Sequence, residues 1–89
     1  MVKKRERLEI IRDILQAISD AKNIKPTRLL YSSNLSPQMF KEYVGELSTK
    51  GLIRESKVKN NKVFILTKKG TDFLKSYKEL EGTIRNFGL

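Results

Sequence analysis

The chain has 89 residues, enough for one domain with a modest core. Lysine and arginine number 19 against 10 acidic residues, which gives a formal net charge of +9 and a pI near 10.0, while 38% of the residues are hydrophobic. These values are typical of a folded module with a polyanionic partner. The sequence contains neither cysteine nor histidine, so we expect no disulfide, no zinc site and no cofactor. Because no cluster of titratable residues has catalytic spacing either, we expect no enzymatic activity.

The basic start Met1–Arg5 does not lead into the apolar stretch of a signal peptide, because Glu6 and Glu9 interrupt it. The longest apolar run, Val63–Leu66, is too short to cross a membrane. We therefore expect a cytoplasmic protein with no membrane partner, and no small-molecule substrate is evident from the residues.

Two helices are predicted in the first third of the chain. Apolar residues at helical spacing predict a helix from Lys4 to about Lys22. Its expected core face consists of Leu8, Ile11, Ile14, Leu15 and Ile18. Pro26 suits the first turn of a helix, so a short helix is expected from Pro26 to about Ser32, and a tight turn at Ser33 and Asn34 should follow.

A third helix is predicted from Ser36 to Lys50, with Ser36 as N-cap, Pro37 in the first turn and Gly51 as the stop. Its expected packing stripe consists of Met39, Phe40, Tyr43, Val44 and Leu47. Its expected free face consists of Gln38, Lys41, Glu42, Gly45 and Ser48. A short helix, a tight turn and a longer helix form a helix-turn-helix pattern, which makes this segment a candidate recognition helix. The alternative is an ordinary amphipathic helix of a small bundle.

Beyond Gly51, Leu52–Glu55 and Lys62–Leu66 are short extended runs around the polar segment Ser56–Asn61. They predict a hairpin with a basic tip, in which Asn60 and Asn61 adopt the positive φ that a tight turn requires. Such a hairpin beside a recognition helix can lie across the adjacent groove of a duplex. The alternative is a loop whose lysines only improve solubility.

Thr67 is expected to cap a last helix from Lys68 to about Phe87. Its apolar residues follow the alternating spacing of a coiled-coil seam: Phe73, Tyr77, Leu80, Ile84 and Phe87. The seam extends past the part that a small domain can cover, so we expect a partner helix in a two-fold symmetric homodimer. The alternative is that the first helix covers the seam within the monomer.

Taken in order, these elements resemble the winged helix-turn-helix fold, and Leu66–Gly70 looks like its strand-to-helix junction. Segments 8–11, 31–36, 51–53 and 66–70 are similar to the small archaeal DNA-binding proteins typified by the dimeric Sulfolobus group, whose terminal helices pair as an antiparallel coiled coil. The resemblance implies an α+β, mostly α fold: a winged helix-turn-helix of three helices and a two-stranded wing in residues 1–70, then a coiled-coil-like dimerisation helix in residues 71–89. The terminal helix of this chain is shorter than in that group.

The expected function is binding of double-stranded DNA by a homodimeric transcriptional regulator, or by an abundant chromatin-like protein, associated with the nucleoid. The recognition helix 36–50 would enter the major groove, and the wing 56–62 would contact the backbone or minor groove. The expected DNA contacts are Thr27, Arg28, Ser36, Gln38, Lys41, Glu42, Lys57, Lys59, Asn61 and Lys62. The expected dimer contacts are the seam residues Phe73, Tyr77, Leu80, Ile84 and Phe87.

Among these residues, Gln38 is the expected base reader, while Arg28 and the wing lysines are expected to bind phosphates. The rival interpretation is a winged-helix module for protein assembly that uses Tyr31, Tyr43 or Phe87 as contact residues. RNA binding is a third interpretation, which lacks the exposed aromatic pair with basic flanks that binds single strands.

Overall fold

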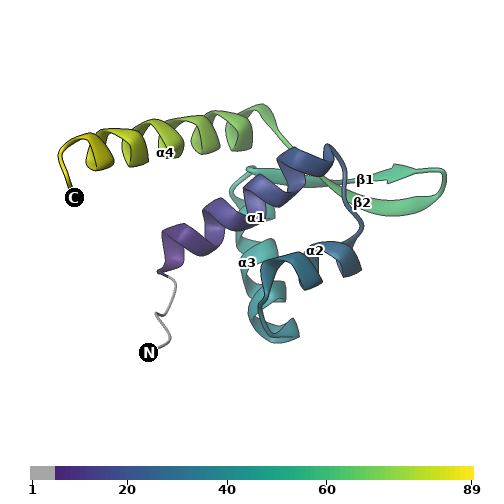
Figure 1. Ribbon diagram of the computed structural model, residues 1–89. Coiled ribbons are helices and arrows are strands. Elements are labelled where there is room, and N and C mark those ends of the chain that lie inside the picture. The colour runs from purple at the N-terminus through teal and green to yellow at the C-terminus, as the bar shows by residue number, and fades with distance from the viewer. Residues whose placement is uncertain (1–5) are drawn as a thin grey trace.

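The computed structural model describes residues 6–89, so the basic start and the predicted helix boundary at Lys4 lie outside the described residues. The elements in chain order are α1 (Arg7–Ala21), α2 (Pro26–Ser33), α3 (Pro37–Thr49), β1 (Ile53–Val58), β2 (Asn61–Leu66) and α4 (Lys68–Asn86). In Figure 1, α2 and α3 lie beneath α1, the hairpin projects to one side, and α4 extends to the other. This arrangement is the predicted mostly helical winged-helix fold with a C-terminal helix.

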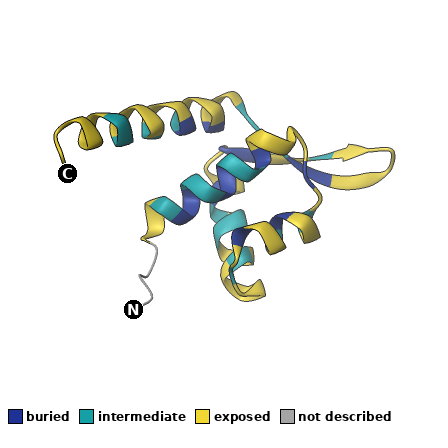
Figure 2. Cartoon of the chain, viewed as in Figure 1, coloured by how far each residue is buried: buried dark blue, intermediate teal, exposed yellow. Residues whose placement is uncertain are grey.

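The core is built around α1, whose inward face packs against α2, α4 and β2 (Figure 2). Its buried members are Ile10, Ile11, Ile14, Leu15 and Ile18 from α1, Leu29 from α2, Leu47 from α3, Ile24, Leu52, Ile53 and Phe64 from the linkers and hairpin, and Leu74 from α4. The predicted face of α1 was wrong at two positions. Ile10, which was not included in the expected core face, is buried, whereas Leu8 is 53% exposed because it faces an open groove beside the outer half of α4.

The turn between α2 and α3 uses local polar groups as the sequence predicted. Asn34 has a left-handed φ of 56°, and the buried Ser33 hydroxyl donates to the Leu30 carbonyl oxygen at 2.7 Å. At the start of α3 the Ser36 hydroxyl accepts the Met39 N–H at 3.2 Å. Gly51, with φ of 76°, follows the end of α3. The predicted cap at Ser36 and stop at Gly51 are confirmed, and they fix where α3 begins and ends.

The hairpin is a regular antiparallel pair whose register runs from Ile53 opposite Leu66 to Val58 opposite Asn61. Its turn residues are Lys59 and Asn60, with φ values of 51° and 67°, so the predicted Asn60–Asn61 turn was wrong by one residue. A two-residue turn of this type needs positive φ at both central positions, and the strand pairing places Asn61 in β2. Backbone hydrogen bonds between Ile24 and Phe64, at 3.1 and 2.8 Å, attach the α1–α2 linker to the outer side of β2.

The junction between β2 and α4 is held against the chain that leaves α3. The Thr67 hydroxyl accepts the Gly70 N–H at 3.1 Å, which caps α4 as predicted, and it donates to the Gly51 carbonyl oxygen at 2.6 Å. The Thr67 N–H donates to the Leu52 carbonyl oxygen at 3.2 Å. A Cβ atom at Gly70 would lie 2.0 Å from that same Leu52 oxygen. Only glycine allows the two segments to approach so closely.

We expect Gly70→Ala to lower the free energy of unfolding by about 1 to 3 kcal/mol, because the added methyl group forces the α4 start away from the Leu52 backbone. Urea unfolding followed by circular dichroism measures the change. Gly45→Ala is the matched control: a Cβ there meets nothing within 4 Å, so it should stabilise α3 by about 0.5 to 1 kcal/mol. A Gly70→Ala variant as stable as the original chain would contradict the tight junction.

Candidate functional site

The outward face of α3 presents polar side chains in its first two turns. Gln38, Lys41 and Glu42 are exposed there, while Leu47 is buried on the opposite face. Met39 was predicted on the packing stripe but is 41% exposed, because it lies on the flank of the helix in the first turn. It places an apolar, flexible side chain beside the hydrogen-bonding groups of Gln38 and Glu42. Spacing alone could not distinguish this flank position from the core.

Gly45 lies in the middle of the same outward face. A Cβ at this position would meet no atom within 4 Å, so no contact within the described part of the chain requires a glycine. A glycine inside a helix costs about 0.5 to 1 kcal/mol relative to alanine, and this cost is not offset by packing. The missing side chain leaves the α3 backbone open to close approach by another surface.

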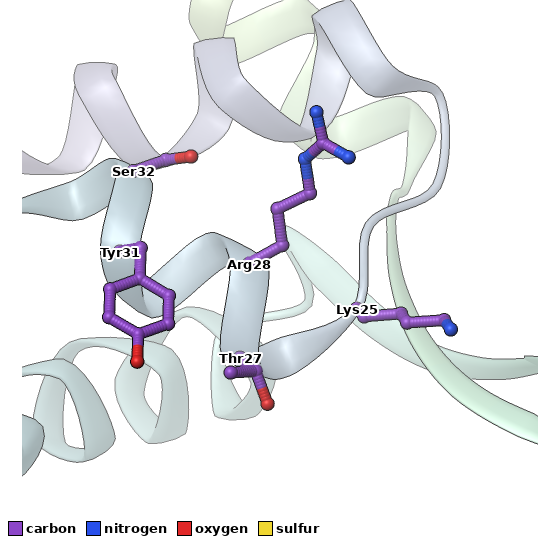
Figure 3. A pocket seen from close by; sticks show the side chains of 5 residues that line it. All are labelled: Lys25, Thr27, Arg28, Tyr31 and Ser32. Carbon is purple, nitrogen blue, oxygen red and sulfur yellow. The ribbon is translucent and has the colours of Figure 1, made fainter.

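The second helix of the pair, α2, contributes a hollow of about 610 Å³ on its outer side. It is lined by Lys25, Thr27, Arg28, Tyr31 and Ser32. Figure 3 shows Arg28 pointing toward α1 and Lys25 pointing toward the hairpin, whereas Thr27 and Tyr31 lie together on the other flank. Thr27 and Arg28, both expected to contact DNA, are exposed. Their side chains lie on different flanks of α2 and face in different directions.

A second hollow, of about 470 Å³, lies between the start of α2 and the wing. It brings together the cations Lys25, Arg28 and Lys59 and the amide side chain of Asn61, and no acidic residue lines it. The sequence prediction did not include Lys25, although its place immediately before the helix-starting Pro26 was a usable signal. Three cations around one hollow form the strongest candidate for anion binding in the described part of the fold.

The wing lysines differ in their ionic environments. Lys62 lies 2.9 Å from a Glu55 carboxylate oxygen, and its ammonium group is 5.8 Å from the centre of the Phe64 ring. Within residues 6–89, Lys57 and Lys59 make no ion pair, and the same holds for Arg28 and Lys41. These four unpaired cations therefore lie on α2, α3 and the wing, where an anionic surface can reach them.

The predicted seam of α4 divides into two parts. Phe73 packs against the core, and Tyr77 stacks on it with ring centres 6.3 Å apart. Arg12 of α1 lies over the Tyr77 ring at 6.0 Å and 3.7 Å from Glu81. Burial, with a smaller effect of the Glu81 carboxylate, raises the pKa of Tyr77 above its ordinary value. The inner half of the seam is thus covered by α1 within the monomer.

The outer half of the seam is open. Leu80, Ile84 and Phe87 are 57%, 43% and 78% exposed. Leu8, Tyr77, Ile84 and Leu89 contribute to a groove of about 370 Å³ between α1 and α4. We call Leu8, Leu80, Ile84, Phe87 and Leu89 the apolar α4 surface. It is a candidate for contact with another chain.

Two of the aromatic residues considered for protein contacts are exposed and one is not. Tyr31 and Phe87 are 79% and 78% exposed. Tyr43, predicted on the packing stripe of α3, is half-buried against the core as expected, with the Arg7 guanidinium 5.7 Å from its ring centre, which argues against its use as an exposed protein contact. Arg7 also pairs with Glu46, so α1 covers Tyr43.

Two other kinds of feature are absent from residues 6–89. No cluster of three acidic, histidine or cysteine side chains there is arranged to hold a metal ion. None of the described helices is both long and apolar enough to span a membrane.

Comparison with known proteins gives a consistent set of relatives. A family model described as winged helix-turn-helix matches residues 4–85. The uncharacterized protein MJ0290 of Methanocaldococcus jannaschii is 35% identical over 77 residues, which are 86% of this chain but only 34% of that protein. This chain therefore spans about a third of the length of that relative.

Two solved structures are similar in fold. Sso10a-2, described as a DNA-binding protein from Sulfolobus solfataricus, has a TM-score of 0.76 at 22% identity, covering 93% of this chain and 85% of its own. A MarR family transcriptional regulator from Silicibacter pomeroyi also has a TM-score of 0.76, at 18% identity, covering 85% of this chain and 52% of its own. The extent of the family match, together with the helix pair and wing described above, shows that this chain belongs to the winged helix-turn-helix family.

Proposed function

We propose that the protein binds double-stranded DNA as a transcriptional regulator, with α3 in the major groove and the wing on the backbone or minor groove. The observation that carries this proposal is the presence of unpaired cations on α2, α3 and the wing, around an outward α3 face that is polar and open at Gly45. An α-helix fits the major groove of B-DNA, and cations beside it gain affinity by releasing counterions from the phosphates.

The relatives support the same assignment. Sso10a-2 is described as DNA-binding, and the Silicibacter pomeroyi protein as a transcriptional regulator. DNA binding would place the protein with the nucleoid in the cytoplasm.

Titration with random and genomic duplex fragments over a range of salt concentrations tests the proposal, since the affinity of a DNA binder falls steeply as salt rises. Absence of binding at low salt would overturn it.

We further propose that the protein acts as a homodimer through the apolar α4 surface. Its members are exposed, and Leu80, Ile84 and Phe87 continue the α4 seam beyond the part that α1 covers. A two-fold axis would present two α3 helices to inverted half-sites, spaced by about 34 to 36 Å or a multiple on one side of the duplex. Dimerisation would raise affinity because the second half-site is held at high effective concentration.

Gln38→Ala should relax sequence preference more than it lowers affinity. A glutamine can bond adenine through two hydrogen bonds, which contributes roughly 1 to 3 kcal/mol of discrimination. Selection of binding sites from a random duplex pool compares the variant with the original protein. Lys57→Ala is the control, because removing a wing cation that is expected to bind a phosphate should weaken all sequences alike. An unchanged preference in Gln38→Ala would remove Gln38 from the base contacts.

Lys57→Gln combined with Lys59→Gln should make the plot of log affinity against log salt shallower by about two units, because each lysine would neutralise one phosphate. Lys62→Gln alone should change the slope less, because Glu55 already balances its charge. Lys75→Gln, at an exposed position of α4, is the control for a general reduction of charge. If the double variant keeps the original slope, the wing does not bind DNA.

Leu80→Asp combined with Ile84→Asp should dissociate the dimer without unfolding the domain, because both side chains are exposed in the monomer. Sedimentation equilibrium measures the mass, and DNA titration measures the fall in affinity that follows. Thr71→Asp combined with Asn86→Asp adds the same charge at exposed α4 positions away from the seam and should leave the dimer intact. The original protein sedimenting as a monomer at tens of micromolar would refute the dimer.

A further inference from the structure

Tyr31 is the most exposed aromatic side chain of the described residues, at 79%, and neither the base contacts nor the wing accounts for it. It lies in the last turn of α2, four residues after Thr27, so the two side chains share one flank of the helix. The other residues that line its hollow are Lys25, Thr27, Arg28 and Ser32, all of them polar and none of them acidic. The ring therefore stands among hydroxyl and cationic groups, with no carboxylate in the lining of its hollow.

The two flanks of α2 face different neighbours. Arg28 and Ser32 line a hollow together with α1 residues Ala17, Asp20 and Ala21, so their flank faces α1. Thr27 and Tyr31 are not part of that hollow, and Figure 3 shows both side chains directed away from α1. Only residues 34–36 separate α2 from the first turn of α3, so Tyr31 lies close in the chain to the end of α3 that presents Gln38. The Thr27–Tyr31 flank is therefore directed away from α1, and in a helix-turn-helix this first helix crosses the DNA backbone.

The chemistry of this flank differs from that of the wing. Thr27 and Tyr31 each carry a neutral hydroxyl that can donate to an anionic oxygen, and cations stand nearby at Lys25 and Arg28. A backbone phosphate of DNA matches this pair, because hydroxyl groups donate to its oxygens, whereas Arg28 and Lys25 point away toward α1 and the hairpin. A neutral donor fixes the position of a phosphate without releasing a counterion.

We propose that Tyr31, with Thr27 beside it, is a neutral phosphate-binding pair that sets the register of α3 on the duplex. The inference rests on the proposed DNA binding. It gives Tyr31 a role in DNA contact in place of protein contact, and it predicts a specific signature. Removing the Tyr31 hydroxyl should lower affinity by a constant factor at every salt concentration, whereas removing a cation should change the salt slope.

The experiment compares Tyr31→Phe with Arg28→Gln in titrations of one duplex at several salt concentrations. Hydrogen bonds to charged groups are strong enough that Tyr31→Phe should lower affinity about tenfold, with an unchanged salt slope. Arg28→Gln should make the slope shallower by about one unit. Because the Tyr31 side chain is exposed, removing its hydroxyl should leave the thermal unfolding midpoint unchanged, and this is measured on the same samples.

A second series replaces single phosphates of that duplex by uncharged methylphosphonates. One position should weaken the original protein and have little further effect on Tyr31→Phe, which would identify the phosphate that Tyr31 binds. Unchanged affinity in Tyr31→Phe would overturn the inference and favour a protein contact, while DNA binding itself would stand. A changed salt slope would also overturn it. If the original protein binds no duplex, the proposed function fails first, and the two failures are distinguishable.

Discussion

The interaction on which the arrangement of the fold depends is the packing of the α4 start against the chain that leaves α3. Thr67 binds both segments at once: its hydroxyl accepts from Gly70 within α4 and donates to Gly51 behind α3. Lys69 adds a hydrogen bond of 2.8 Å to the Lys50 carbonyl oxygen. The missing Cβ of Gly70 is what allows the backbones to meet. Because the closest approach is to main chain, the junction cannot relax by moving a side chain.

This junction links the two surfaces on which the proposed function relies. The junction joins the end of α3 to the start of α4, and the packing of α4 against α1 fixes the direction of α4 in the fold. At 1.5 Å per residue α4 is about 30 Å long, which carries its exposed end well away from the hairpin. In a two-fold dimer, the direction of α4 would therefore set the distance between the two recognition helices.

How much the sequence could predict depends on whether a feature is local. The caps at Ser36 and Thr67 and the stop at Gly51 act within a few residues, and each was predicted correctly. Leu8 is exposed and Ile10 is buried because of the place where α4 crosses α1. Helical spacing within α1 carries no information about that crossing. The turn at Lys59 and Asn60 was missed because either neighbouring pair can adopt positive φ, and only the strand register decides between them. In the candidate site, the ion pair of Lys62 with Glu55 was likewise unpredictable, because it depends on cross-strand geometry.

Folding also separates the charges of a chain whose net charge is +9. The groove beside the apolar α4 surface is lined by three acidic residues, Glu6, Glu9 and Glu81, and by one cation, Arg85. The hollow between α2 and the wing is lined by three cations and no acidic residue. If the positive charge served only solubility, there would be no reason for acidic residues to gather at one end of the domain and cations at the other. A surface that attracts phosphates, in contrast, needs its acidic residues to lie elsewhere. This separation of charge is a stronger argument for DNA binding at the α2–wing end than the net charge itself, and it leaves the α4 end suited to a different kind of partner.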